Sequence, residues 1–148
     1  MMIEARFQIR WESFELNINT AFPANGVTAV FGPSGCGKTT FLRAIAGLEI
    51  SHGGFLKVGD QVWQQGDFFL PPHKRSLGYV FQETSLFTHL NVRQNIEYGL
   101  KRLRNGRSRI SMGQILELLD IGHLLTRDTT SLSGGEQKRV AIARALAA

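Results

Sequence analysis

Alternating apolar and polar residues predict β-strands in the first part of the chain. Residues 3–9 (IEARFQI) and 14–18 (FELNI) carry apolar side chains at every second position, which is typical of a half-buried strand. The alternation returns from Gly54 to Trp63 and predicts a hairpin strand. Two other runs, Val27–Phe31 (VTAVF) and Leu77–Gln82 (LGYVFQ), are apolar without alternation. We expect both runs to be fully buried strands of a parallel sheet.

The apolar spacing becomes helical after residue 37. In KTTFLRAIAGL (38–48), Phe41, Leu42, Ile45 and Leu48 share one face, and Gly47 is placed to end the helix. Helical spacing also covers 92–103, 112–119 and 134–148. The chain is therefore expected to have an α/β part over residues 1–83 and a helical part over residues 84–148.

Composition narrows the class of protein. Hydrophobic residues make up 43% of the 148 residues and charged residues 20%, which excludes a disordered chain. No apolar run approaches the roughly 18–20 residues of a membrane-spanning helix, and the first residues do not have the pattern of a secretory signal. The single cysteine excludes an intrachain disulfide and a Cys-cluster zinc site.

The net charge is modestly positive, at 17 − 12 = +5. Residues 101–109 (KRLRNGRSR) include five cationic side chains. This segment is either a patch that binds nucleic acid or a membrane surface, or a solvated helix end or loop. No aromatic residue interleaves there for base stacking, which favours the solvated segment, and we expect no nucleic-acid partner.

A phosphate-binding loop follows the expected strand Val27–Phe31. GPSGCGKT, from Gly32 to Thr39, satisfies G-x-x-x-x-G-K-[ST]. Glycines in such a loop let successive backbone N–H groups turn toward a polyanion, and the following helix directs its positive end to the same place. Lys38 supplies a charge for the terminal phosphates and Thr39 a hydroxyl for Mg²⁺. The pattern predicts nucleoside triphosphate binding and leaves the reaction open.

A second helix start suited to an anion lies at residues 131–139 (SLSGGEQKR). Ser133 and Glu136 form the S-x-x-E capping pattern, and Gly134 and Gly135 occupy the first turn. Glycine costs about 1 kcal/mol in a helix relative to Ala, so the pair is explained if a ligand approaches the N–H groups closely.

LSGGE, from Leu132 to Glu136, resembles the signature motif of ATP-binding-cassette (ABC) ATPases, and the resemblance extends over the entire chain. It implies a P-loop NTPase core with an N-terminal antiparallel β subdomain and an inserted α-helical subdomain. It also implies a homodimer in which the phosphate loop of one subunit and the signature motif of the other enclose ATP. The nucleotide contacts carried over are Gly32, Pro33, Ser34, Gly35, Cys36, Gly37, Lys38, Thr39 and Thr40 of the loop, and Ser133, Gly134, Gly135 and Glu136 of the signature motif.

Two further roles follow from the same resemblance. Gln82, at the end of YVFQ, matches the glutamine that reaches Mg²⁺ and the attacking water, so Lys38 and Gln82 are the catalytic candidates and Thr39 and Gln82 the metal candidates. Trp11 stands at a spacing similar to that of the aromatic residue that stacks on adenine, with Phe14 as the competitor and ordinary strand packing as the alternative.

The family's catalytic carboxylate has no counterpart in the sequence. The strand that ends in Asp-Glu is absent, and ILELLD (115–120) fits an amphipathic helix better. We therefore expect the chain to be the front portion of an ABC ATPase, ending in the signature helix and inactive in hydrolysis by itself.

The stretch from Phe69 to Leu100 resembles ATP-binding subunits of molybdate importers. Sulfate, ferric-iron and polyamine importer subunits share much of this pattern, and a nucleotide-binding module that never hydrolyses ATP is the alternative of another class. The resemblance implies permease subunits as partners, docked on an apolar groove at Leu86, Phe87 and Leu90 unless these side chains are plain core. It further implies an indirect partnership with a periplasmic or extracellular oxyanion-binding protein, and a peripheral place on the cytoplasmic face of the bacterial inner membrane.

Overall fold

The computed structural model describes residues 1–101 and 110–148, and these form two compact units, Met1–Ser76 and Leu77–Ala148. Residues 77–83 group with the second unit, whereas the domain boundary between 83 and 84 stays a prediction. Most of the basic stretch 101–109 lies outside the described residues. No helix within the described ranges has the length and apolar character needed to cross a membrane.

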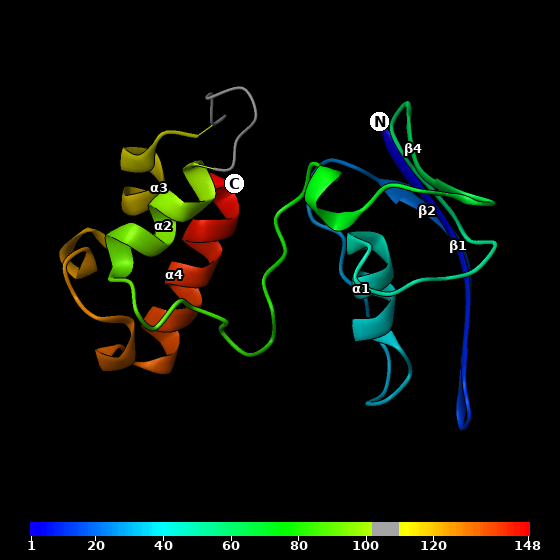
Figure 1. Cartoon of the computed structure of the whole chain (residues 1–148), viewed down its shortest axis with the longest axis horizontal. Coiled ribbons are helices and arrows are strands. Elements are labelled where there is room, and N and C mark those ends of the chain that lie inside the picture. The colour runs from blue at the N-terminus through cyan, green and yellow to red at the C-terminus, as the bar shows by residue number, and fades with distance from the viewer. Residues whose placement is uncertain (102–109) are drawn as a thin grey trace. The chain divides into compact units, whose positions relative to one another are not determined.

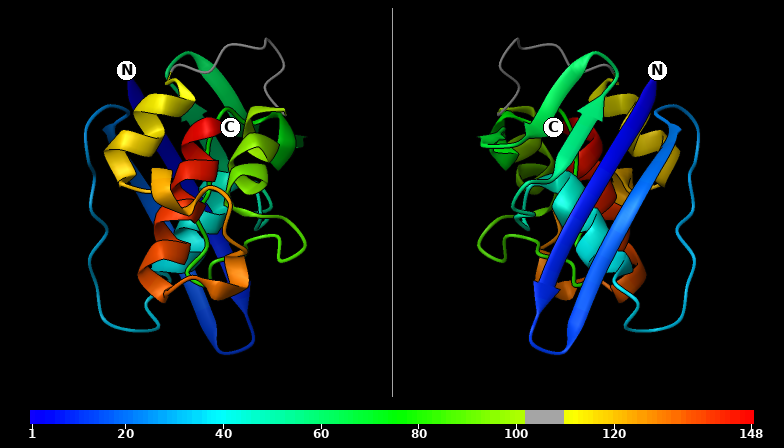
Figure 2. Two further views of the ribbon diagram at one scale, coloured as in Figure 1. Left: turned by 90° about the vertical axis from the view of Figure 1, so that its left-hand side faces the viewer. Right: turned by 90° about the vertical axis from the view of Figure 1, so that its right-hand side faces the viewer.

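The first unit contains an antiparallel sheet in the order β2-β1-β3-β4-β5, with the long strands β1 and β2 side by side in Figure 2. Its strands are β1 (Met2–Trp11), β2 (Phe14–Pro23), β3 (Phe55–Val58), β4 (Gln61–Gln65) and β5 (Phe68–Phe69). The predicted alternation is confirmed, because Ala5, Phe7 and Ile9 of β1 are all buried. The run 54–63, expected as one hairpin strand, is two strands, β3 and β4, separated by a turn at Gly59 and Asp60 and paired with a bulge between Leu56 and Lys57.

Helix α1 (Lys38–Ala46) belongs to this first unit and packs on the sheet (Figure 1). The Phe41 ring meets those of Phe7 and Phe22 edge-on, with centroids 6.2 and 6.4 Å apart. The helix ends at Gly47 as predicted, in a left-handed conformation with φ 76°. The predicted stripe is wrong at Leu42, which is 46% exposed, whereas the small residues Ala44 and Ala46 are buried.

The second unit is helical, with α2 (Val92–Leu100), α3 (Met112–Leu119) and α4 (Gly134–Ala147) (Figure 1). Two short 3₁₀ turns, Gly122–Leu124 and Thr129–Ser131, lie between α3 and α4. Its core is apolar and includes Ile96, Ile115 and Val140, each fully buried. Helices α2 and α4 approach closely at Gly99, where a Cβ atom would lie 2.6 Å from the carbonyl oxygen of Arg144. The three helices predicted from apolar spacing are confirmed, α2 as far as Leu100.

Two predicted strands are wrong. Val27–Phe31 and Leu77–Gln82 have no strand assignment, and Val27 and Phe31 are 99% and 90% exposed. A parallel strand is stabilised only by neighbours that complete its hydrogen-bond ladder and cover both faces. Every strand pairing among the described residues is antiparallel, so neither apolar run has such a neighbour.

The antiparallel β subdomain and the helical subdomain are both confirmed.

Candidate phosphate-binding site

The phosphate loop lies in the first unit, exposed from Gly32 to Cys36, directly before α1. Gly37 is the N-cap of α1 and has φ 96°, a left-handed conformation that favours glycine. No side chain caps the helix start, and its first turn contains no acidic residue. The first N–H groups of a helix have no partner within the helix, so this end of α1 is suited to receive an anion.

Lys38 closes the loop on itself. Its Nζ donates to the carbonyl oxygens of Gly32 and Pro33, at 2.7 Å each, and lies 3.8 Å from Sγ of Cys36. The ammonium therefore holds the two ends of the loop together and places a positive charge at its centre. Cys36 is exposed, as an accessible loop residue should be.

The end of the β1–β2 hairpin lies against this loop. A Cβ atom on Gly37 would be 2.8 Å from Cζ of Phe14 and 2.8 Å from Cδ1 of Leu16, so both side chains pack directly on the glycine. Trp11 pairs with Phe14 in the strand register, and their rings lie 5.6 Å apart at 33°. Phe14 therefore packs on the phosphate loop, and Trp11, the more exposed of the two at 43%, lies beside Phe14.

The second helix start, at Ser133, lies in the second unit and has the predicted capping box. The backbone N–H of Ser133 donates to Oε2 of Glu136 at 2.7 Å, and the N–H of Glu136 donates to Oγ of Ser133 at 3.3 Å. These two hydrogen bonds, the backbone one first, lower the pKa of Glu136, with the nearby charges of Arg127 and Arg139 adding to the effect. Gly134 and Gly135 are exposed, and nothing lies within 4 Å of the position of a Cβ atom on either.

Gln82 also belongs to the second unit, where it is exposed in a bend rather than at the end of a strand. The structure describes Thr39 and Gln82 in different units, so their joint metal site stays a prediction. Among the described residues, no three His, Cys, Asp or Glu side chains gather as metal ligands.

The segment after Gln82 is bonded to the signature helix. Oγ1 of Thr84 donates to Oε1 of Gln137 at 3.1 Å, and Nη2 of Arg144 donates to the carbonyl oxygen of Ser85 at 2.8 Å. The guanidinium of Arg144 also lies 4.9 Å from the centre of the Phe87 ring. Arg144 is not among the site residues predicted from the sequence. Helix α4 also contains Lys138 and Arg139, so no local pattern distinguishes Arg144.

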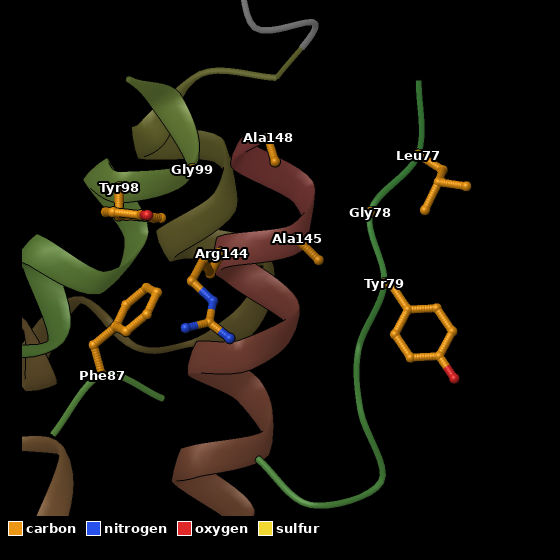
Figure 3. A pocket seen from close by; sticks show the side chains of 9 residues that line it. All are labelled: Leu77, Gly78, Tyr79, Phe87, Tyr98, Gly99, Arg144, Ala145 and Ala148. Carbon is orange, nitrogen blue, oxygen red and sulfur yellow. The ribbon is translucent and has the colours of Figure 1, made fainter. Parts of the chain in front are cut away.

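Arg144 lines a pocket of about 210 Å³ in the second unit. Figure 3 shows its guanidinium directed toward Phe87, with Tyr98 and Gly99 on α2. Of the predicted apolar groove, Phe87 lines this pocket, whereas Leu86 packs against the helical core. The role of the groove in docking a partner stays a prediction.

Comparison with known proteins gives a family and close relatives. The family model described as ABC transporter matches residues 16–148. The Molybdenum import ATP-binding protein ModC of Pseudomonas syringae pv. tomato is 56% identical over 146 residues, which cover 97% of this chain and 40% of the relative. The protein of the same name from Rhodobacter capsulatus is 57% identical over 145 residues, covering 98% and 40%. The chain therefore spans about 40% of the length of these curated relatives.

A solved structure has the same fold. It is an ABC transporter of the metal-chelate type in an inward-facing conformation, with a TM-score of 0.68 and 26% sequence identity. The match covers 98% of this chain and 55% of the solved one.

Proposed function

The chain belongs to the ABC transporter family, and from this premise we propose that it is the nucleotide-binding part of the ATP-binding subunit of an importer. The observation that carries the proposal is the loop Gly32–Gly37, exposed as far as Cys36, in front of a helix start that no side chain caps. A polyphosphate would bond to those N–H groups and to the ammonium of Lys38.

The carbonyl bonds of Lys38 support a specific role for this residue. Its Nζ is held at Gly32 and Pro33, so the charge is already placed at the loop before a nucleotide arrives. Binding would add phosphate oxygens as acceptors without a large movement of the side chain.

Thr39 and Gln82 are the residues that would hold Mg²⁺. Thr39 is an exposed residue in the first turn of α1, and Gln82 is an exposed residue in its bend. When bound, the ion would neutralise charge on the phosphates.

Trp11 is the better candidate for the adenine ring. It is the more exposed of the two aromatics and rests on Phe14, which itself packs against Gly37. We therefore assign Trp11 to stacking and Phe14 to supporting it.

The signature motif would complete a site in a homodimer. Gly134 and Gly135 have open space around them, so the N–H groups of the first turn of α4 are accessible to the γ-phosphate held by another subunit. Ser133 also holds the capping box, and its hydroxyl could contact phosphate while its backbone stays bonded to Glu136.

Hydrolysis is proposed for the longer subunit and not for these 148 residues. The sequence offers Lys38, Thr39 and Gln82 for phosphate and metal, but no carboxylate in the family's position for polarising the attacking water. Positioned general-base help contributes roughly 10²–10⁴ in rate. We infer that the chain alone turns over ATP at background level.

Molybdate is the proposed cargo of the importer, because the two relatives named above, at 56% and 57% identity, are molybdenum import proteins. The cargo would not touch this subunit, which would act at the cytoplasmic face of the membrane on permease subunits. Phe87, beside the pocket of the second unit, is the proposed contact with a permease. An oxyanion-binding protein outside the membrane is the indirect partner.

The test combines binding and turnover on one preparation. Purified chain is incubated with Mg-ATP, and bound nucleotide and released phosphate are measured beside a Lys38→Ala control. The proposal predicts bound nucleotide with phosphate at background. Absence of bound nucleotide would overturn the binding site, and robust phosphate release that disappears in Lys38→Ala would overturn the claim that the catalytic base lies outside these residues.

A further inference from the structure

Arg75 is a buried arginine in the first unit, with an exposed fraction of 5%. Its Nε donates to the carbonyl oxygen of Leu70 at 2.8 Å, and its Nη1 donates to those of Ala44 at 3.1 Å and Ile45 at 2.5 Å. The guanidinium also lies 4.9 Å from the centre of the Phe69 ring. One side chain therefore joins the end of β5 to α1.

The carbonyls of Ala44 and Ile45 belong to the last turn of α1. The Ala44 carbonyl also accepts the N–H of the C-cap Gly47 at 3.0 Å. Carbonyls of a last helical turn have no partner in a following turn, and a cation beside them interacts favourably with the negative end of the helix dipole. Gly47 leaves the necessary room, because a Cβ atom there would lie 2.7 Å from Cζ of Arg75. Arg75 is thus a cap for the end of α1 opposite the phosphate loop.

No carboxylate within the described ranges forms an ion pair with Arg75. Its Nη2 is buried without a hydrogen-bond partner. A buried cation is costly unless it is compensated, and here its bonded partners are backbone carbonyls, most of them at the helix end. The burial of the Arg75 guanidinium is therefore explained by its hydrogen bonds to the end of α1 rather than by a surface ion pair.

The two ends of α1 differ in a way that matters for an anion. The start has a glycine N-cap, no side-chain cap and no acidic residue, whereas the far end is fixed by Arg75. Capping at the start would compete with a ligand for the same N–H groups. Fixing the helix from its far end keeps those groups open while holding the helix in place.

We propose that Arg75 is a positioning residue for the phosphate loop: it holds α1 against the β5 end and so fixes where Lys38 and Thr39 stand. The expected effect of Arg75 on ATP binding rests on the proposed nucleotide function. The expected effect of Arg75 on the position of α1 does not depend on that function. Arg75 itself is a helix length away from the loop, roughly 13 Å for nine residues.

The test uses Arg75→Met, which keeps the length and loses the donors, and Arg75→Lys, which keeps the charge. Amide hydrogen exchange is followed in α1 and, as an internal reference, in β1 and β2, without nucleotide. We expect exchange in α1 to rise about tenfold in Arg75→Met relative to the strands, and less in Arg75→Lys. ATP affinity should fall by about tenfold and be partly restored by lysine.

Two controls separate positioning from general stability. Arg43→Met removes a cation from the same end of α1 that is 40% exposed and paired with Glu49, and should change neither readout. Leu56→Ala opens a cavity under β3 and should destabilise the unit without a selective effect on α1.

The outcomes are distinguishable. If the wild-type chain does not bind ATP, the proposed function fails while the exchange comparison still judges Arg75. Exchange that rises equally in α1 and the strands would make Arg75 a general stabiliser and overturn the proposal. If Arg75→Met does not fold, Arg75→Lys decides. The proposal then requires hydrogen exchange in α1 of Arg75→Lys to rise about threefold relative to β1 and β2.

Discussion

Gly37 is the position where the phosphate loop leaves least room for a side chain. It has φ 96°, and a Cβ atom would lie 2.8 Å from both Cδ1 of Leu16 and Cζ of Phe14. Gly37→Ala therefore brings two penalties, a left-handed backbone that an L-residue disfavours and a clash with the end of the β1–β2 hairpin.

The size of the effect follows from these two penalties. The left-handed conformation costs roughly 1–2 kcal/mol, and overpacking a tight site costs roughly 1–3 kcal/mol. The lower chain entropy of alanine in the unfolded state returns about 0.4–1 kcal/mol. We expect Gly37→Ala to lower the free energy of unfolding of the first unit by about 1–4.5 kcal/mol.

Urea unfolding followed by tryptophan fluorescence measures this loss, because both tryptophans, Trp11 and Trp63, belong to the first unit. The matched controls are Gly26→Ala and Gly35→Ala, at φ 78° and 80°, where nothing lies within 4 Å of the new methyl group. Each should lose only the backbone part, about 1 kcal/mol. Equal losses at Gly35 and Gly37 would refute the inference that Phe14 and Leu16 pack tightly on the loop.

Three further predictions concern the loop and the signature motif. Cys36 is exposed in the loop, so an alkylating reagent should label it readily, and saturating Mg-ATP should slow the labelling; an unchanged rate would contradict nucleotide binding at the loop. Ser133→Ala removes the acceptor of the capping box and should lower the free energy of unfolding of the second unit by about 1 kcal/mol. Tyrosine signals report this loss, since Tyr79 and Tyr98 both lie in that unit, and an unchanged unfolding midpoint would argue against the box. Because the pKa of Glu136 is lowered in the folded state, its charge stabilises above the ordinary Glu pKa, and this contribution is lost as pH falls through the lowered value. The stability difference between wild type and Glu136→Gln should therefore vanish in acid; a difference that persists there would mean that the charge is not its source.

Local patterns predicted the elements whose stabilisation is local. The alternation in β1, the end of α1 at Gly47 and the capping box at Ser133 each depend on residues a few positions apart, and all three are confirmed. The phosphate loop was recognisable for the same reason, since its glycines and Lys38 lie within one short segment.

The wrong strand prediction and the two unpredicted arginines depend on contacts between residues that lie far apart in the sequence. Val27–Phe31 has the composition of a buried strand, but composition cannot say whether a neighbouring strand is present to pair with it. Arg75 and Arg144 bond to backbone oxygens 30 and 59 positions away in the sequence, and any residue type can supply such an oxygen. No pattern within the surrounding segment therefore marks either arginine as a tie between elements.

Titration of the chain with Mg-ATP, followed by calorimetry, measures whether the loop Gly32–Thr39 is the nucleotide site. Lys38→Ala removes the ammonium that Gly32 and Pro33 hold at the loop, and Lys74→Ala removes an exposed ammonium of the same unit outside the loop. We expect saturable binding to the wild-type chain and to Lys74→Ala. Binding to Lys38→Ala should be at least tenfold weaker, because a charge-assisted phosphate contact of about 1.5–3 kcal/mol is lost. Equal affinity of the wild-type and Lys38→Ala proteins, both folded, would contradict the assignment of this loop as the nucleotide site.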